Sequence, residues 1–351
     1  MSGWIARLRM LRDAGTPAVL VTVAATRGSV PREPGTKMIV TQDGTFDTIG
    51  GGHLEYKAIE IARGMLAGGE GASLQRFVLG ASLGQCCGGI VELLFERIGT
   101  AAGWVETAAT LYDRNTPCVL ITSVDARGST QKQVVTAEES YEASSSEEAV
   151  ARARALLGSE EGAVLAPDGN EGGRLFLDLL RPPRMQVVLF GAGHVGQALV
   201  RMLTGLPCRI TWVDSRDDAF PKGLPGNVTV VATGDPEAEA DAAAPGSHFL
   251  VMTHSHDLDL RLCERVLARE DFVYFGLIGS ATKRRRFEQQ LVRRGVSAAR
   301  LARMTCPIGV GGISDKHPAA IAVAVAAEIL QAHERGSAVV RERDQPKRHA
   351  S

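Results

Sequence analysis

Short apolar runs alternate with amphipathic stretches through the second half of the chain, and this pattern predicts strands that alternate with helices. The predicted strands are Met185–Phe190, Arg209–Val213, Val228–Ala232, His248–Met252 and Val273–Ile278. The predicted helices are His194–Thr204, Leu258–Arg269, Thr282–Arg294 and Pro318–Glu334. Apolar strands joined by helices are typical of a parallel sheet covered on both faces. This half is therefore predicted to be a Rossmann-type, doubly wound α/β fold.

The first half of the chain contains an internal repeat. The strand and Arg-Gly-Ser turn within Thr16–Ser29 recur within Thr116–Ser129, 100 positions later. Helical stretches precede the two copies, at Trp4–Ala14 and Val105–Arg114. The shared order of helix, strand and turn favours duplication over chance. This half is predicted to be an α+β region with a duplicated helix-strand unit.

These patterns divide the chain into an N-terminal domain (1–100), a diverged second copy with a linker (101–183), a Rossmann-type domain (184–334) and a tail (335–351). The second copy lacks the glycine and cysteine motifs of the first, which indicates a structural role. Arg181–Arg184, with its two prolines, is the predicted linker. The charged tail is predicted to be disordered.

Composition and charge exclude several classes of function. The formal net charge is −1, from 39 basic and 40 acidic residues, so no overall field favours nucleic acid or an anionic membrane. No run reaches the ~18 apolar residues of a transmembrane helix, and the N-terminus lacks the apolar core of a secretory signal. The six cysteines are dispersed, which argues against a disulfide framework. A cytoplasmic protein without nucleic-acid or membrane partners is expected.

The first candidate binding motif follows the first strand of the Rossmann-type domain. Gly191, Gly193 and Gly196 fit the pattern G-x-G-x-x-G between a strand and a helix, where the helix N-terminus can hold a phosphate. Asp214 ends the next strand, where an acid usually binds ribose hydroxyls. His194 lies inside the loop and either donates to the phosphate or faces solvent at the helix start.

A second glycine turn opens a basic helix. Gly279 and Ser280 end a strand, and Lys283 lies in the first helical turn, where it could hold a second phosphate or a carboxylate. Arg285 and Arg286 are better explained as a solvated helix face.

Two histidines follow the fourth predicted strand of the Rossmann-type domain. His254 and His256, with Asp257, resemble part of a metal site. The alternative is a polar loop in which Asp257 caps the next helix.

A run of three glycines precedes a predicted helix in the N-terminal domain. The amides of Gly50, Gly51 and Gly52 could form an anion nest for a cofactor, with Glu55 as an acceptor.

The adjacent thiols of Cys86 and Cys87 lie beside two further glycines. A thiolate can bind a soft metal or carry sulfur, whereas the alternative is a small buried side chain. The glycine context favours the functional interpretation.

Together these motifs resemble the XdhC/CoxI family of molybdenum-cofactor chaperones, over nearly the whole chain. The motifs are Arg27–Arg32 with Gly35 and Met38, Gly50–Glu55, Cys86–Gly89, Phe190–Gly196, Thr253–Asp257, Gly276–Ser280 and Pro307–Gly309. Several motifs in one order are far more specific than any single motif.

The resemblance implies a protein that binds molybdenum cofactor (molybdopterin) as cargo. Such a protein protects the cofactor during sulfuration, with help from a cysteine desulfurase, and inserts it into the apo xanthine dehydrogenase molybdenum subunit or a related hydroxylase. It also implies contact with molybdenum-cofactor biosynthesis proteins, a homodimer, and a chaperone rather than an enzyme.

Two other functions fit the glycine loop. One is an NAD(P)-dependent oxidoreductase, which Gly191–Gly196 and Asp214 support but for which no acid–base constellation is evident. The other is a non-catalytic scaffold that binds a dinucleotide.

Overall fold

The computed structural model describes residues 3–69, 71–79, 88–125, 129–142, 145–159, 161–168, 173–183 and 185–344. The chain divides into two compact units, Met1–Pro182 and Pro183–Ser351, and the boundary falls within the predicted linker. Among the described residues, no helix combines the length and apolar character needed to cross a bilayer.

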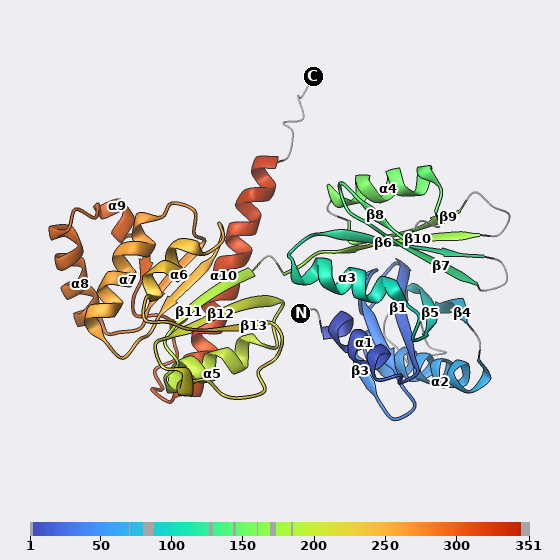
Figure 1. Cartoon of the computed structure of the whole chain (residues 1–351), viewed down its shortest axis with the longest axis horizontal. Helices are drawn as coiled ribbons and strands as arrows, with labels where there is room; N and C mark the ends of the chain where they lie inside the picture. Colours follow the sequence, from blue (N-terminus) through green and yellow to red (C-terminus); the bar gives the residue numbers. More distant parts are fainter. Residues whose placement is uncertain are drawn as a thin grey trace, which may run out of the picture. The chain divides into compact units, whose positions relative to one another are not determined.

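The first unit is built from two copies of one seven-element pattern (Figure 1). The first copy consists of α1 (Gly3–Asp13), β1 (Ala18–Arg27), β2 (Lys37–Val40), β3 (Thr45–Asp47), α2 (Gly52–Gly68), β4 (Ala72–Val78) and β5 (Ile90–Ile98). The second consists of α3 (Gly103–Asp113), β6 (Cys118–Val124), β7 (Thr130–Val135), β8 (Ser140–Tyr141), α4 (Glu147–Leu157), β9 (Ala163–Pro167) and β10 (Arg174–Leu180). The sheet orders β3-β2-β1-β5-β4 and β8-β7-β6-β10-β9 are equivalent. The predicted duplication is confirmed, and it extends over each entire copy.

Both faces of the central strand β1 are buried, and its side chains alternate between two cores. Val19 and Val21 pack in the cluster that contains Leu54 of α2. Leu20 packs in a second cluster, which also contains its equivalent Leu120 from β6 and the buried faces of α1 and α3. The two copies therefore share one inner core, while α2 covers the other face of the first sheet.

Two lysines occupy equivalent buried positions in the two copies. Lys37 on β2 is aligned with Thr22 on β1, and Lys132 on β7 is aligned with Thr122 on β6. Two acids are equivalent in the same way. They are Glu96 on β5, opposite Leu20, and Asp178 on β10, opposite Leu120.

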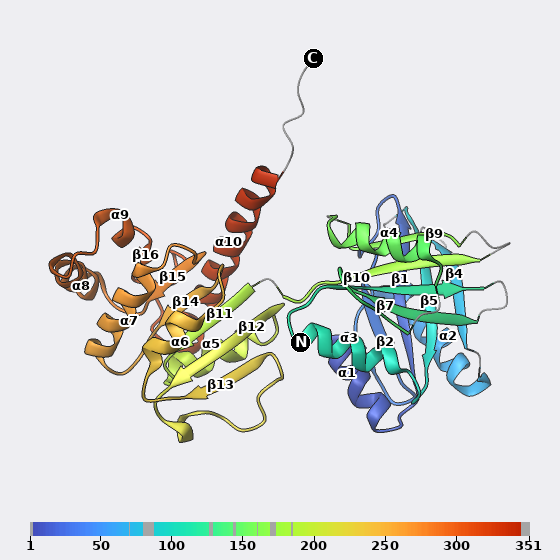
Figure 2. The same cartoon turned by 45° about the horizontal axis from the view of Figure 1, so that its top comes forward.

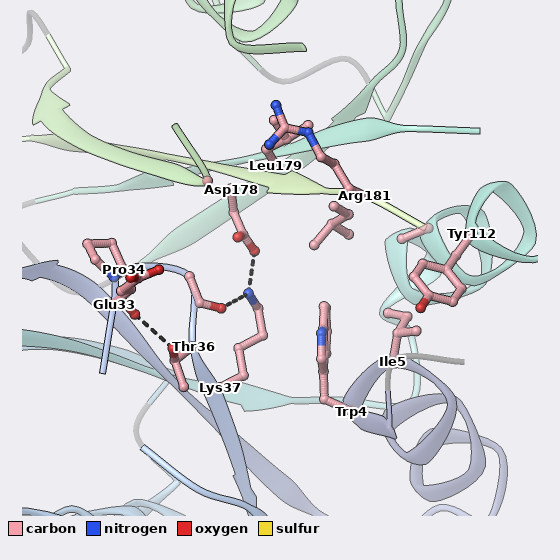
Figure 3. A pocket seen from close by; sticks show the side chains of 14 residues that line it. Trp4, Ile5, Glu33, Pro34, Thr36, Lys37, Tyr112, Asp178, Leu179 and Arg181 are labelled. Carbon is pink, nitrogen blue, oxygen red and sulfur yellow. Dashed lines mark hydrogen bonds and ion pairs between the residues drawn. The ribbon is translucent and has the colours of Figure 1, made fainter. Parts of the chain in front are cut away.

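Ion pairs between these residues cross from one copy to the other. Lys37 Nζ lies 2.6 Å from Asp178 Oδ2 (Figure 3). Lys132 Nζ lies 2.9 Å from Glu96 Oε1. Each ammonium also lies over a tryptophan ring of its own copy. These rings are Trp4, with its centroid 4.7 Å from Lys37, and Trp104, with its centroid 4.8 Å from Lys132. The first unit thus has an approximate twofold pattern of charge at the interface between its copies.

The second unit is a six-stranded parallel sheet of order β13-β12-β11-β14-β15-β16 (Figure 2). Its strands are β11 (Met185–Phe190), β12 (Cys208–Asp214), β13 (Val228–Ala232), β14 (His248–Val251), β15 (Tyr274–Leu277) and β16 (Met304–Thr305). Its helices are α5 (His194–Leu203), the 3-10 turn η2 (Asp217–Ala219), α6 (Pro236–Ala242), α7 (His256–Ala268), α8 (Ala281–Arg293), α9 (Ala298–Leu301) and α10 (Pro318–Asp344). The predicted Rossmann-type fold is confirmed.

Helices cover both faces of this sheet. Leu189 of β11 packs with Leu199 of α5 and Ile329 of α10, whereas its neighbour Phe190 packs with Phe287 of α8 in a separate core. The order of strands reverses between β11 and β14, and ligands of open α/β sheets bind at the carboxyl edge at such a point.

The tail differs from the prediction of disorder. Helix α10 continues past Glu334 to Asp344, and this extension contains Ala, Arg and Glu residues, which have high helix propensity. The remaining predicted tail, 345–351, lies outside the described residues.

Candidate functional site

Three motifs that are distant in the sequence meet in the first unit. A Cβ atom on Gly89 would lie 2.4 Å from the Ser29 carbonyl oxygen and 2.8 Å from that of Arg27. A Cβ atom on Gly50 would lie 2.7 Å from Cβ of Pro31. Only glycine permits such close approaches, because no other residue lacks this atom. The Arg-Gly-Ser turn, the triple glycine and the Gly88-Gly89 segment therefore form one loop cluster.

The triple glycine binds an anion from its own helix. Glu55, in the first turn of α2, accepts hydrogen bonds from the Ile49 amide (3.0 Å), the Gly51 amide (3.1 Å) and the Thr48 hydroxyl. Positive φ angles of 123° at Gly50 and 74° at Gly51 turn the loop around this carboxylate. The nest predicted for a cofactor anion is thus occupied by Glu55, and Gly52 begins the helix that supplies it.

Arg27 and Arg32 are exposed on the same loop cluster. Within the part of the chain that the structure describes, neither guanidinium has an ion-pair or hydrogen-bond partner. The exposed rings of His53 and Tyr56 lie on the first turns of α2, with centroids 6.2 Å apart. Both arginines belong to the sequence motif, but the sequence did not single them out as anion ligands. They become the candidates because Glu55 already accepts the neighbouring amides.

Cys86 and Cys87 lie outside the described residues, and Gly88 and Gly89 directly follow them. The other four cysteines are buried and unpaired. Burial, together with the charge of Asp178, raises the pKa of the Cys118 thiol to about 12. Burial likewise raises the pKa values of the remaining three thiols, those of Cys208, Cys263 and Cys306. These four are core side chains rather than reactive thiolates.

The glycine loop of the second unit is tightly packed at both ends. A Cβ atom on Gly191 would lie 2.3 Å from the Met252 carbonyl oxygen, and one on Gly196 would lie 2.2 Å from that of Gly191. Gly193 has open space around it, and His194 is exposed at the start of α5. The loop therefore joins β11 closely to β14 and leaves its middle free for a ligand.

Asp214 is fully engaged at the end of β12. Its carboxylate accepts the Ala192 amide at 2.7 Å, and the Arg216 side chain through Nε at 2.9 Å and Nη2 at 3.0 Å. Burial would raise its pKa, but the hydrogen bonds from Arg216 and Ala192 outweigh burial and lower the pKa to about 2. Asp214 is ionised and anchors the glycine loop.

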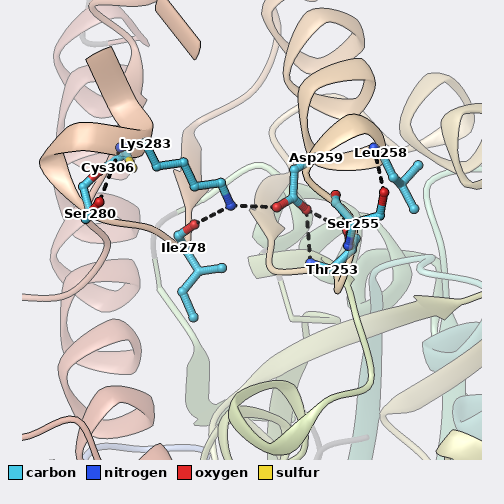
Figure 4. A network of polar contacts seen from close by, with 8 residues as sticks. All are labelled: Thr253, Ser255, Leu258, Asp259, Ile278, Ser280, Lys283 and Cys306. Atoms are coloured by element: carbon cyan, nitrogen blue, oxygen red, sulfur yellow. Dashed lines mark hydrogen bonds and ion pairs between the residues drawn. The ribbon is translucent and has the colours of Figure 1, made fainter. Parts of the chain in front are cut away.

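Lys283 is held inside the second unit rather than presented to solvent (Figure 4). Its ammonium lies 2.6 Å from Asp259 Oδ2 and donates to the Ile278 carbonyl at 2.9 Å. Asp259 also accepts the Thr253 amide at 3.1 Å and its hydroxyl at 2.7 Å. Ser280 caps α8 by accepting the Lys283 amide, and a Cβ atom on the adjacent Gly279 would meet the lysine stem. Lys283, the residue predicted to hold a second phosphate, therefore links the loop after β14 to the loop after β15.

His254 and His256 are both exposed at the carboxyl edge of β14. His254 lines a very small cavity together with Gly191 and Asp214, while His256 begins α7. Across the described residues, no group of three or more His, Cys, Asp or Glu side chains is placed to hold a metal ion. The alternative prediction that Asp257 caps α7 is wrong. Ser255 is the cap, because its hydroxyl is one residue before the helix and reaches the Leu258 amide.

Both units match known families. Residues 11–78 match the XdhC and CoxI family, and residues 187–329 match the XdhC Rossmann domain. The chain belongs to the XdhC and CoxI family. The loop cluster of the first unit and the carboxyl edge of the parallel sheet in the second unit thus carry the sequence motifs of an XdhC protein.

Two known proteins are similar to this chain. The uncharacterized protein YqeB of Escherichia coli (strain K12) is 31% identical over 153 residues, which are 42% of this chain and 27% of YqeB. This XdhC chain therefore spans well under half the length of that relative. A solved structure described as a xanthine dehydrogenase from Bacillus halodurans covers 98% of both chains, with a TM-score of 0.71 and 18% identity. At that identity, the likeness shows the shared fold.

Proposed function

We propose that this protein is a molybdenum-cofactor chaperone for xanthine dehydrogenase or a related molybdenum hydroxylase. It binds the cofactor as cargo, protects it while a cysteine desulfurase helps to install the terminal sulfido ligand, and inserts it into the apoenzyme. Cofactor biosynthesis proteins supply the cargo, and the working form is a homodimer. Membership of the XdhC and CoxI family and the likeness to a structure described as a xanthine dehydrogenase support this proposal.

The observation that carries the proposal is the convergence of three motif loops in the first unit. The contacts of Gly89 and Gly50 hold Arg27–Arg32 beside the segment that immediately follows Cys86 and Cys87. The cargo combines a phosphate with a sulfur-held metal. Exposed arginines suit the phosphate, and the two cysteines that directly precede Gly88 in the sequence carry thiols that suit the metal.

In this proposal, Arg27 and Arg32 bind the phosphate of the cofactor. Glu55 already accepts the amides of the glycine nest, so a second anion there would face a carboxylate. The two guanidinium groups are exposed and unpaired among the described residues, and they offer donors that fit phosphate oxygens.

Replacing both Arg27 and Arg32 with alanine should lower the cofactor content of the purified protein at least about tenfold, because each charge-assisted contact contributes about 1.5–3 kcal/mol. Pterin fluorescence after oxidation, per mole of protein, measures the effect. Arg63→Ala is the matched control, since it removes an exposed arginine from α2 away from the loop cluster. Equal losses in the control and the double variant would contradict the assignment.

In the double variant Cys86→Ser, Cys87→Ser, the molybdenum content per mole of purified protein should fall at least about tenfold. The reason is that a hydroxyl is a poor ligand for a soft metal or sulfur centre. The protein would be purified without oxygen from cells that make the cofactor, and molybdenum would be measured by elemental analysis. Gln85→Ala changes the same segment without removing a thiol and should retain the metal. Full molybdenum retention with undiminished activation of apo xanthine dehydrogenase would refute the thiol role.

A further inference from the structure

The end of β12 is the place where a Rossmann unit distinguishes the ribose of its nucleotide. An acid there normally accepts the two ribose hydroxyls, whereas a nearby arginine accommodates a phosphate on the ribose. This chain has both residue types, as Asp214 and Arg216. Their contacts decide which of them faces a ligand.

The carboxylate of Asp214 has no accepting capacity left for a ribose diol. Oδ1 accepts the Arg216 amide at 3.0 Å and its Nε at 2.9 Å. Oδ2 accepts the Ala192 amide at 2.7 Å and Arg216 Nη2 at 3.0 Å. A diol could enter only by displacing the arginine or the amide that shapes the glycine loop.

Arg216 is the solvent-facing member of the pair. Its side chain is 48% exposed, whereas that of Asp214 is 4% exposed. A guanidinium has five N–H donors in a planar fork, and the contacts with Asp214 use two of them. The remaining donors lie on the outer edge of the pair, and the ion pair fixes the plane in which they are presented.

We propose that the Rossmann unit binds nucleotides that carry a phosphate on the ribose, as NADP(H) does, and that Arg216 selects them over nucleotides with a free diol. The site uses residues of the second unit alone, and the inference goes beyond cofactor delivery.

The glycine loop leaves room for the other phosphates of such a nucleotide. Helix α5 starts at His194 without a side-chain cap, so its first amides have no acceptor from that source. A Cβ atom on Gly193 would meet nothing within 4 Å, which leaves the approach to those amides open. Phosphates at this helix end and at Arg216 would flank the ribose.

Calorimetric titration of the whole protein with 2′,5′-ADP and with 5′-AMP isolates the ribose phosphate, because the two ligands differ only in that group. The wild type should bind 2′,5′-ADP at least about tenfold more tightly, as one bidentate charge-assisted contact provides. NADPH and NADH should show the same preference. Equal affinities, a preference for AMP, or no binding of either ligand would overturn the proposal.

Arg216→Ala gives a prediction of opposite sign. It frees the carboxylate of Asp214, so the variant should bind AMP more tightly than 2′,5′-ADP, whose phosphate the carboxylate then repels. Arg216→Lys keeps the charge without the fork and should reduce the preference without reversing it. Arg201→Ala removes an exposed charge elsewhere on α5 and should leave the preference intact. An unchanged preference in Arg216→Ala would show that another group reads the phosphate.

Discussion

Replacing Lys37 with methionine should cost the first unit about 3–5 kcal/mol of free energy of unfolding, because it leaves the carboxylate of Asp178 buried without its counter-charge. Both side chains of the pair are only 3% exposed, so water cannot take the place of the ammonium. Methionine keeps most of the volume of the lysine stem. The loss therefore reports on the charge rather than on a cavity.

Amide hydrogen exchange in β2 and β10 measures this loss within one unit, with β14 as an internal reference. Lys132→Met should have a similar effect on β7 and β5, since the duplication gives Lys132 the equivalent position and a buried acid partner. Lys57→Met removes an exposed pair with Glu60 and should leave exchange unchanged.

The double variant Lys37→Met, Asp178→Leu tests whether the ion pair adds net stability or only offsets the cost of burying its two charges. Apolar residues of similar size often replace a buried pair without loss, so the double variant should recover most of the stability. A double variant as unstable as Lys37→Met alone would mean that the Asp178 position itself requires a polar group. Unchanged hydrogen exchange in Lys37→Met would mean that the ion pair with Asp178 does not stabilise the first unit.

Local sequence patterns predicted the duplication, but they could not predict the ion pairs that join the two copies. Strand, turn and helix recur at one spacing because each is specified by neighbouring residues. Lys37 and Lys132 do not share that spacing, because the turn between β1 and β2 is longer than its counterpart between β6 and β7. The crossing of the two ion pairs depends on how the copies pack, and no local signal encodes that.

The same distinction holds in the second unit. The strands and the long helices were predicted because apolar runs and helical periodicity are local. Helices α6 and α9 and strand β16 were missed, because Pro236–Ala242, Ala298–Leu301 and Met304–Thr305 are too short for a period to show.

The sequence singled out several charged residues beside glycine loops but could not give their partners. Asp214, Glu55 and Lys283 each have a protein group where a ligand atom was expected. A charged residue beside glycines is equally compatible with binding a ligand and with fixing the loop. Only the tertiary contacts distinguish these roles.

Replacing Lys283 with methionine should destabilise the second unit by about 3–5 kcal/mol, because Asp259 is fully buried and would lose its counter-charge. Its two hydrogen bonds from Thr253 remain, but they do not neutralise the charge. Asp259→Asn should cost less. The stem of Lys283 is long and 11% exposed, so the freed ammonium can turn towards water, whereas the carboxylate of Asp259 cannot.

Hydrogen exchange in α7 and α8 shows which of the two variants, Lys283→Met or Asp259→Asn, is more destabilised. Arg294→Gln is the control. Arg294 forms an exposed pair with Glu264 at the end of α8, and such pairs contribute about 0.2–1 kcal/mol. If Lys283 instead served as a phosphate ligand, its loss would weaken 2′,5′-ADP binding and leave exchange near that of the control. Greater destabilisation by Asp259→Asn than by Lys283→Met would contradict the role assigned to the Lys283–Asp259 ion pair. It would mean that the hydrogen bonds to Thr253, rather than the charge pair, hold the loop after β14 to the loop after β15.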